Sequence, residues 1–253
     1  MKRPFTPRNT KAVFFDMNNT LVDPKASFDA CFVNVLVDFA GRWDNDGEGW
    51  DPGSVLATYK AQWNGIAPRL AGKPQELERA KKQCLEAALR RYPFLVNDAF
   101  VHSFFREMRR QMRDRAVLVP NALEAVAKLS GAYRLGIITN GGKEQQERVM
   151  NRLGLADYIA GDLVVASNRS GVRKPNPAIF RSALSAAGVR PGEAVMVGDS
   201  WKNDILGAVK CGMNAVWLNR AGARKSSRRK AGSVEIPVVA GFGELTELFE
   251  PLS

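Results

Sequence analysis

Short apolar segments alternate with helical patterns along much of this chain, and this alternation constrains the fold more than any other feature. The apolar segments have the length of buried strands. They span residues 12–15, 134–139, 162–166, 194–197 and 215–218. Helical patterns follow or separate the later segments, over residues 122–129, 144–153, 177–187 and 205–209. Strands that alternate with helices form a parallel sheet covered by helices on both faces. The sequence therefore predicts an α/β core.

Residues 24–115 have a different pattern. Apolar side chains recur there at helical spacing, as in Phe28, Phe32 and Val35 and again in Phe104 and Met108. No segment of this region resembles a strand, so we expect four helices. This change of pattern predicts two domains: an α/β core made of residues 1–23 and 116–253, and an all-helical domain inserted at residues 24–115.

Composition excludes several kinds of site. The chain of 253 residues has one histidine and three cysteines. These cannot build a zinc site rich in histidine or cysteine, and they argue against a Ser-His-Asp triad. No apolar run is long enough to span a membrane, and no apolar leader follows the basic N-terminus. Together with the unpaired cysteines, this predicts a cytoplasmic protein that does not enter membranes.

The net charge is strongly positive, because 37 Lys and Arg outnumber 26 Asp and Glu to give +11. Such a charge suits nucleic acid, anionic lipid or a small phosphorylated substrate. The basic residues concentrate between residues 220 and 230, where no aromatic side chains are interleaved. We interpret this stretch as a solvated loop and expect no nucleic-acid partner. The sequence makes no prediction about the oligomeric state.

Four polar clusters carry the candidate chemistry. They are residues 16–23 (Asp-Met-Asn-Asn-Thr-Leu-Val-Asp), 139–141 (Thr-Asn-Gly), 173–177 (Arg-Lys-Pro-Asn-Pro) and 198–204 (Gly-Asp-Ser-Trp-Lys-Asn-Asp). Three of them follow predicted strands, and functional residues of parallel sheets gather at that edge.

The residue types in these clusters suit a phosphate and magnesium site. Asp16, Asp199 and Asp204 offer the oxygen ligands that Mg²⁺ prefers, and carboxylates this close together need a cation among them. Lys174 can neutralise both a carboxylate and a phosphoryl oxygen. The Thr139 hydroxyl and the backbone N–H groups of the glycines after it can face an anion. A carboxylate beside a metal and facing a phosphate is a candidate nucleophile.

In order and position, the four clusters resemble the motifs of the haloacid dehalogenase (HAD) superfamily. The resemblance covers residues 11–23 and 116–220, and the helical insert resembles the type-1 cap of that superfamily. It implies a Rossmann-like HAD fold and a hydrolase of the phosphatase type. It also implies that Asp16 is the nucleophile that forms an aspartyl-phosphate, and that Lys174 steadies Asp16 and the transferring group.

The same resemblance assigns the remaining site residues. Thr139, Asn140 and Gly141 are expected to bind the substrate phosphate, together with Lys174. Asp16, Asp199, Asp204 and the backbone carbonyl of Asn18 are expected to bind Mg²⁺.

Asn18 departs from the family pattern, because the phosphatases usually carry a second Asp there as acid and base. An amide cannot exchange a proton at a useful pKa, and general acid–base catalysis is typically worth roughly 10²- to 10⁴-fold. Several interpretations stay open: a slow phosphatase that prefers good leaving groups, a phosphotransferase whose aspartyl-phosphate persists, or a near-inactive relative that acts by binding or regulation. A fourth interpretation, a 2-haloacid dehalogenase, has less support. Asn18 could also be a substitution introduced into an ordinary family sequence, Asp-Met-Asp-Asn-Thr, and the sequence does not distinguish an introduced Asn18 from a natural one.

We therefore predict a Mg²⁺-dependent phosphatase of the HAD type that hydrolyses a small phosphorylated metabolite through Asp16, slowed by Asn18.

Overall fold

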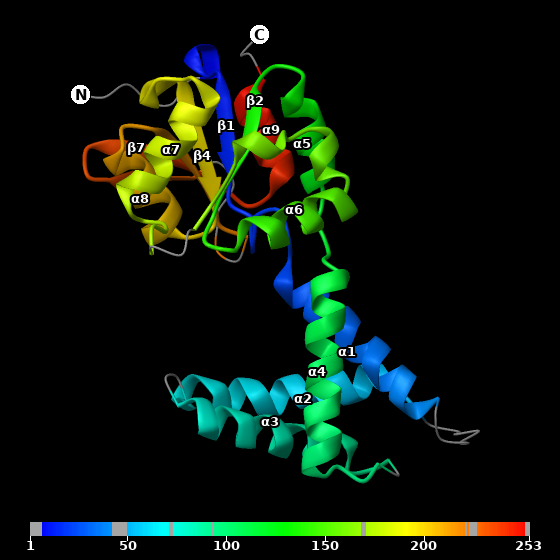
Figure 1. The fold of residues 1–253 in the computed structure, drawn as a ribbon. Helices are drawn as coiled ribbons and strands as arrows, with labels where there is room; N and C mark the ends of the chain where they lie inside the picture. The colour runs from blue at the N-terminus through cyan, green and yellow to red at the C-terminus, as the bar shows by residue number, and fades with distance from the viewer. Residues whose placement is uncertain are drawn as a thin grey trace. The chain divides into compact units, whose positions relative to one another are not determined.

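The chain divides into two compact units. The computed structural model describes residues 7–41, 50–70, 73–92, 94–167, 171–220, 222 and 227–250. One unit contains Met1–Pro24 and Ala116–Ser253, and the other contains Lys25–Arg115 (Figure 1). Each unit has its own apolar core.

A single sheet forms the centre of the first unit. Its strands are β1 (Ala12–Phe15), β2 (Arg134–Thr139), β3 (Val164–Ala166), β4 (Ala194–Gly198), β5 (Asn214–Leu218), β6 (Ser227–Ala231) and β7 (Val234–Val239). Their order across the sheet is β3-β2-β1-β4-β5-β7-β6. Neighbouring strands are parallel, except that β6 runs antiparallel to β7. The prediction of a parallel α/β core is confirmed.

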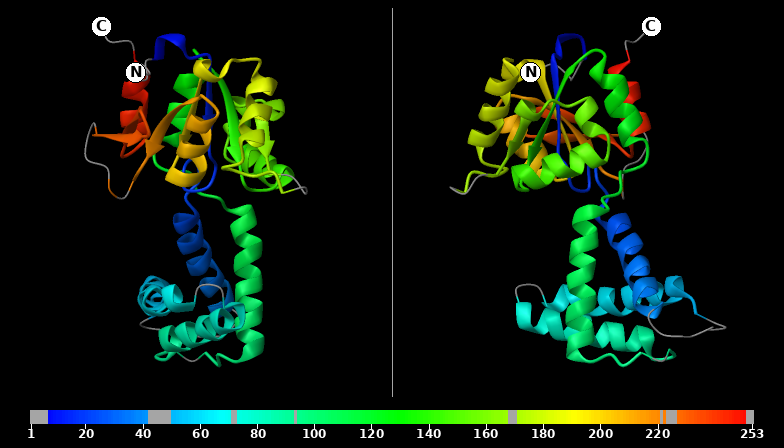
Figure 2. Two further views of the ribbon diagram at one scale, coloured as in Figure 1. Left: turned by 90° about the vertical axis from the view of Figure 1, so that its left-hand side faces the viewer. Right: turned by 45° about the vertical axis from the view of Figure 1, so that its right-hand side comes forward.

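Helices cover both faces of this sheet (Figure 2). One face packs against α5 (Ala122–Ser130), α6 (Lys143–Arg152) and α9 (Phe242–Phe249), and the other packs against α7 (Pro177–Ala187) and α8 (Leu206–Lys210). All four side chains of β1 are fully buried, as expected of a central strand covered on both sides. Short turns complete the unit: η1 (Pro7–Asn9), η3 (Leu155–Asp157), η4 (Gly161–Leu163), η5 (Pro191–Glu193) and the π-helical turn η6 (Trp201–Ile205).

Every regular element among the described residues of the second unit is a helix. It contains α1 (Pro24–Ala40, whose first residue belongs to the other unit), α2 (Pro52–Ile66), η2 (Ala67–Leu70), α3 (Pro74–Leu89) and α4 (Asp98–Asp114). Aromatic rings form much of its core: the Phe32 ring lies 4.9 Å from Tyr59 and 5.1 Å from Phe104, measured between centroids. Among the described residues, no helix combines the length and the apolar character that a membrane crossing requires.

Two predictions from the sequence need correction. The segment 162–166 is a strand only from Val164, because residues 161–163 form the turn η4. The basic stretch 220–230 is not a loop throughout, because residues 227–231 form β6. Backbone pairing with β7 makes this strand despite its run of exposed basic side chains. Residues 221 and 223–226 of the same stretch lie outside the described residues.

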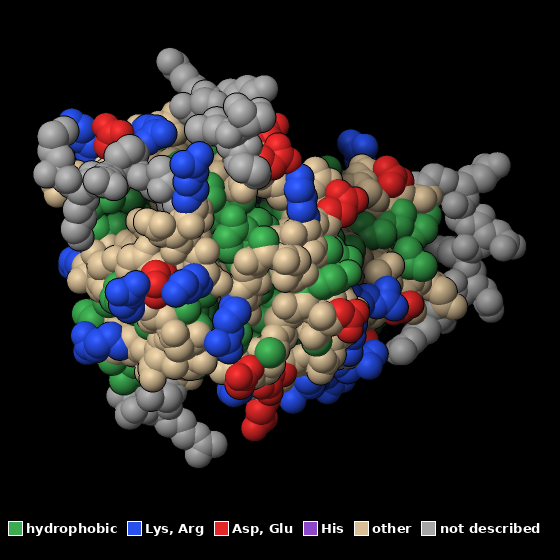
Figure 3. Space-filling model, turned by 90° about the horizontal axis from the view of Figure 1, so that it is seen from above, with side chains coloured by type: hydrophobic (Ala, Val, Ile, Leu, Met, Phe, Trp, Pro, Cys, Tyr) green, Lys and Arg blue, Asp and Glu red, His purple; other side chains and the backbone are tan. Residues whose placement is uncertain are grey.

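Basic side chains are dispersed on the face of the molecule shown in Figure 3. Lys and Arg side chains stand there among Asp and Glu side chains instead of gathering into one patch. Several pairs are in contact, such as Lys11 with Glu193 at 3.0 Å and Lys128 with Glu250 at 2.6 Å. Pairs of this kind neutralise some of the basic side chains locally.

The packing of β2 on β1 predicts the effect of one substitution. A Cβ atom at Gly136 would lie 2.6 Å from the Phe14 ring and 2.9 Å from the Leu163 carbonyl oxygen. We expect Gly136→Ala to lower the free energy of unfolding by about 1–3 kcal/mol, the usual cost of overpacking a core. Urea unfolding would measure it, with Gly192→Ala as the control, because a Cβ at Gly192 meets nothing within 4 Å. Equal stability of the two variants would contradict this account of the sheet.

Candidate active site

One cavity of about 410 Å³ lies at the carboxyl edge of the parallel sheet, where β1, β2 and β4 end. All eight residues predicted from the sequence line it, together with Asn19, Ser200 and Asn203. The eight are Asp16, Asn18, Thr139, Asn140, Gly141, Lys174, Asp199 and Asp204. Segments far apart in the sequence meet here because parallel strands present their carboxyl ends at one edge.

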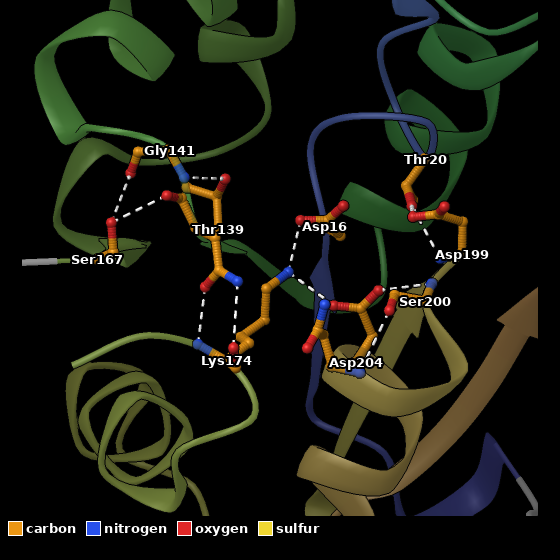
Figure 4. A network of polar contacts seen from close by, with 11 residues as sticks. Asp16, Thr20, Thr139, Gly141, Ser167, Lys174, Asp199, Ser200 and Asp204 are labelled. Atoms are coloured by element: carbon orange, nitrogen blue, oxygen red, sulfur yellow. Dashed lines mark hydrogen bonds and ion pairs between the residues drawn. The ribbon is translucent and has the colours of Figure 1, made fainter. Parts of the chain in front are cut away.

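Lys174 lies between two carboxylates (Figure 4). Its Nζ atom is 2.5 Å from Asp16 Oδ1 and 2.7 Å from Asp204 Oδ1. The lysine is only 3% exposed, and Asp204 is buried as well. A lysine is rarely buried to this extent unless its charge is paired. The two ion pairs therefore fix the ammonium group at the floor of the cavity.

A third carboxylate completes an acidic cluster. Asp16, Asp199 and Asp204 each present an oxygen atom, and these atoms lie within 4.8 Å of one another. Burial raises the pKa of Asp16 to about 6, with Lys174 opposing the rise and Asp204 adding to it. Burial and the nearby charge of Asp204 also raise the pKa of Asp199 above its ordinary value. Three carboxylates against one ammonium group leave excess negative charge in the cavity.

This donor set fits a small divalent cation. Mg²⁺ prefers carboxylate oxygen ligands, and its charge would balance the excess that Lys174 leaves uncompensated. Two hydrogen bonds brace the ligand loops: the Asp199 N–H donates to Thr20 Oγ1 at 3.1 Å, and the Ser200 N–H donates to Asp204 Oδ2 at 2.9 Å. These two bonds therefore hold the backbone at Asp199 and the carboxylate of Asp204.

The side chain of Asn140 contacts the backbone of Lys174. Its side chain accepts a hydrogen bond from the Lys174 N–H at 2.7 Å and donates to the Lys174 carbonyl oxygen at 3.1 Å. The carboxamide thus holds the backbone of the buried lysine. The predicted contact of the Asn140 amide with a substrate phosphate stays a prediction.

Gly141 lines the same cavity, and its N–H donates a hydrogen bond to Thr139 Oγ1 at 3.1 Å. Its contact with a substrate phosphate stays a prediction. Thr139 is buried and keeps its own hydroxyl proton to donate. Gly141 leaves room for the side chain of Gln146, which a Cβ atom at this position would strike.

Sequence reasoning missed several residues that shape the site. Thr20 is fully buried and connects the loop after β1 to Asp199. The Ser200 Oγ atom accepts a hydrogen bond from the Asn203 N–H at 3.2 Å, and the Ser167 hydroxyl donates to the Asn140 carbonyl oxygen at 2.9 Å. Thr20, Ser200 and Asn203 belong to the polar clusters 16–23 and 198–204, and this membership could have indicated them as site residues. Ser167 carries no comparable signal in the sequence.

Known proteins resemble this chain along most of its length. A family model described as haloacid dehalogenase-like hydrolase matches residues 10–212. Pyrimidine 5'-nucleotidase YjjG of Escherichia coli is 31% identical over 214 residues, which cover 82% of this chain and 85% of the relative. Phosphoserine phosphatase of Thermus thermophilus is 37% identical over 151 residues, or 58% of this chain and 54% of the relative.

A solved structure shows the same fold. The HAD-hydrolase YfnB of Bacillus subtilis, in a crystal form bound to magnesium, superposes with a TM-score of 0.62 at 19% identity. The match covers 96% of this chain and 99% of the other.

The acidic cluster predicts that a divalent cation stabilises the protein. We expect saturating MgCl₂ to raise the melting temperature relative to EDTA, because a ligand at about 100 times its Kd adds about 2.7 kcal/mol. Asp199→Asn should remove most of this shift. Asp157→Asn, at an exposed position outside the cavity, should keep it. Thermal unfolding followed by circular dichroism would measure both. An equal magnesium shift in the two variants would place the cation elsewhere.

Proposed function

The chain belongs to the haloacid dehalogenase-like hydrolases, and from this membership we propose that it is a magnesium-dependent phosphatase acting on a small phosphorylated metabolite. One observation carries the proposal: the buried ammonium group of Lys174 contacts Asp16 and Asp204, with Asp199 beside them in a single cavity. This arrangement combines a nucleophilic carboxylate, a fixed positive charge for a phosphoryl oxygen and the oxygen ligands for a cation.

The cation is Mg²⁺ in this proposal, held by Asp16, Asp199, Asp204 and the carbonyl of Asn18. When bound, it would neutralise charge on the phosphoryl oxygens and orient the group for attack. The raised pKa values of Asp16 and Asp199 express the repulsion and burial that such a cation would relieve.

The chemical steps rest on the residues of the chain. A carboxylate oxygen of Asp16 attacks phosphorus, the bond from phosphorus to the leaving oxygen breaks, and an aspartyl-phosphate forms. Lys174 neutralises negative charge on Asp16 and on the transferring group, and Thr139 donates its hydroxyl proton to a phosphoryl oxygen. Water then attacks the aspartyl-phosphate, releases inorganic phosphate and restores the Asp16 carboxylate. Two proton transfers accompany these steps: the leaving oxygen gains a proton from solvent, and the attacking water loses one to solvent.

Asn18 slows both proton transfers in this scheme. The residue is exposed and lines the cavity two positions after the nucleophile. Its amide can donate a hydrogen bond, but it neither gives a proton to the leaving oxygen nor takes one from water. Substrates whose leaving oxygen needs no proton, such as aryl and acyl phosphates, should therefore react faster than alkyl phosphates.

The named relatives suggest which substrates to test. YjjG is a pyrimidine 5'-nucleotidase and the Thermus relative is a phosphoserine phosphatase, so both names specify a phosphate monoester of a small molecule. We propose that residues 24–115 are the cap domain that selects among such monoesters. The predicted cytoplasmic location stays a prediction.

A second candidate function is supported by Asn18 itself. If water attacks the aspartyl-phosphate slowly, another acceptor hydroxyl can take the phosphoryl group, and the protein would act as a phosphotransferase. A 2-haloacid dehalogenase has less support, because its chemistry requires no magnesium and would leave the cluster of Asp199 and Asp204 without a purpose.

Restoring the acid–base residue should accelerate hydrolysis. We expect Asn18→Asp to raise phosphate release from alkyl monoesters, such as phosphoserine and a pyrimidine nucleotide, by roughly 10²- to 10⁴-fold. The gain on p-nitrophenyl phosphate should be smaller, because its leaving group needs no proton. Asn19→Asp is the matched control, since it adds the same charge one residue away in the same cavity. No gain in Asn18→Asp, or an equal gain in Asn19→Asp, would contradict the assignment.

Removing the nucleophile should abolish turnover. We expect Asp16→Asn to reduce hydrolysis of acetyl phosphate to background, because an amide is a poor nucleophile toward phosphorus. Mass spectrometry of the parent protein, quenched in acid during turnover, should show one added phosphoryl group that the variant lacks. Full activity in Asp16→Asn would refute the nucleophile, and label on a different residue would reassign it.

A further inference from the structure

Two tryptophan side chains adjoin the loop that carries the acidic cluster. Trp201 is the first residue of η6, the turn that contains Asp204, and Trp217 lies in β5. Their ring centroids are 5.1 Å apart and their planes meet at 63°. Both rings are partly buried. The proposed chemistry uses neither of them.

Trp217 contacts the backbone of a candidate metal ligand. Its indole Nε1–H donates a hydrogen bond to the carbonyl oxygen of Asp199 at 2.8 Å. On the other side of the same residue, the Asp199 N–H donates to Thr20 Oγ1 at 3.1 Å. Both peptide groups that flank the Asp199 side chain are therefore held, one by the loop after β1 and one by Trp217.

Arg229 in turn covers both tryptophans. Its guanidinium carbon lies 4.2 Å from the centroid of the Trp201 ring and 5.0 Å from that of Trp217. These distances are within the range of attractive cation–π contacts. Arg229 comes from β6, whose partner β7 lies next to β5 in the sheet. We call residues 227–239, which form β6 and β7, the basic hairpin, and residues 199–204 the acidic loop. The basic hairpin thus contacts the ring of Trp201, which belongs to the acidic loop, and the ring of Trp217, which adjoins it.

The neighbouring Arg228 provides a contrast. Successive side chains of a strand point to opposite faces of the sheet, so Arg228 and Arg229 point in opposite directions. Arg228 lies 3.6 Å from Glu235 on β7. The two arginines therefore share a strand, a charge and exposure to solvent, but the cation–π contacts with Trp201 and Trp217 belong to Arg229.

We propose that Trp217 is a positioning residue for Asp199, and that Arg229 holds the Trp201–Trp217 pair against the acidic loop. The basic hairpin thereby sets the affinity of the acidic cluster for Mg²⁺. This inference rests on the proposed function, because it assumes that Asp199 binds the cation. Residues that orient metal ligands typically contribute 10- to 100-fold to metal affinity.

Simple electrostatics would act in the opposite direction. A positive charge near a cation site weakens cation binding, so removing Arg229 should tighten Mg²⁺ binding if only its charge matters. If Arg229 acts by holding the tryptophans, its removal should weaken binding. The sign of the change therefore separates the two explanations.

The experiment measures Mg²⁺ affinity by calorimetry on the full chain. We expect Trp217→Phe, which keeps a ring but loses the N–H donor, to weaken binding by roughly tenfold or more. Arg229→Gln should weaken it severalfold, and Arg229→Lys should recover part of the loss. Arg228→Gln, with the same charge change, should bind as the parent does. Thermal unfolding in EDTA would check that each variant is folded.

A second measurement needs no metal. In a ¹H–¹⁵N spectrum of the protein in EDTA, the indole N–H signal absent from Trp217→Phe identifies Trp217. We expect this proton to exchange with solvent faster in Arg229→Gln than in Arg228→Gln. Because Arg229 is exposed, the Mg²⁺ affinities of its variants keep the proposal testable even if Trp217→Phe fails to fold.

The outcomes separate the inference from the proposed function. If the parent binds Mg²⁺ and hydrolyses phosphate monoesters while Trp217→Phe and Arg229→Gln bind with parental affinity, the inference is wrong and the proposed function stands. Tighter binding in Arg229→Gln, or equal weakening in Arg228→Gln, would also overturn it. If the parent binds no Mg²⁺, the proposed function fails and the inference fails with it.

Discussion

The buried ion pairs of Lys174 are the interaction on which the site depends. An ammonium group removed from water is strongly unfavourable unless carboxylates surround it, and Asp16 and Asp204 supply them from two different loops. Asn140 fixes the backbone of the same lysine from a third loop. The loops after β1 and β2 and the turn η6 therefore all contact one residue of the segment before α7, Asp16 and Asp204 through its ammonium group and Asn140 through its backbone.

The charged groups of the site and its proton-transfer position are separable. Lys174 is ion-paired with Asp16 and Asp204, and Asp199 lies beside them, whereas Asn18 is exposed and lines the same cavity. An amide at position 18 therefore leaves the ion pairs intact. The cavity therefore keeps its charged residues, while position 18 lacks a side chain that can transfer protons.

Sequence reasoning predicted the core and its edge because both depend on simple periodicity. Each buried strand is a short apolar run, so the positions of Asp16, Thr139 and Asp199 at strand ends could be predicted without a structure. Hydrogen bonds within the loops could not be, because they depend on backbone conformation. The hydrogen bonds of the Asn140 carboxamide with the Lys174 backbone, and of the Gly141 N–H with Thr139, are examples that the residue types alone did not indicate.

The strand β6 and the contact of Trp217 with Asp199 escaped prediction for a related reason. Arg228, Arg229 and Lys230 give no apolar alternation, so the strand exists through its pairing with β7 and not through its own pattern. The indole contact joins residues 18 positions apart through a hydrogen bond to a backbone carbonyl, which leaves no signature in the sequence.

The basic character of β6 has a further consequence at the level of the whole sheet. This strand is one edge of the sheet, and an open edge offers unpaired backbone groups to which a strand of another molecule can add. Exposed Arg228, Arg229 and Lys230 repel a second copy of the same edge. The opposite edge, β3, is only three residues long and offers little to pair with. Both ends of the sheet are thus protected against aggregation, one by charge and the other by length.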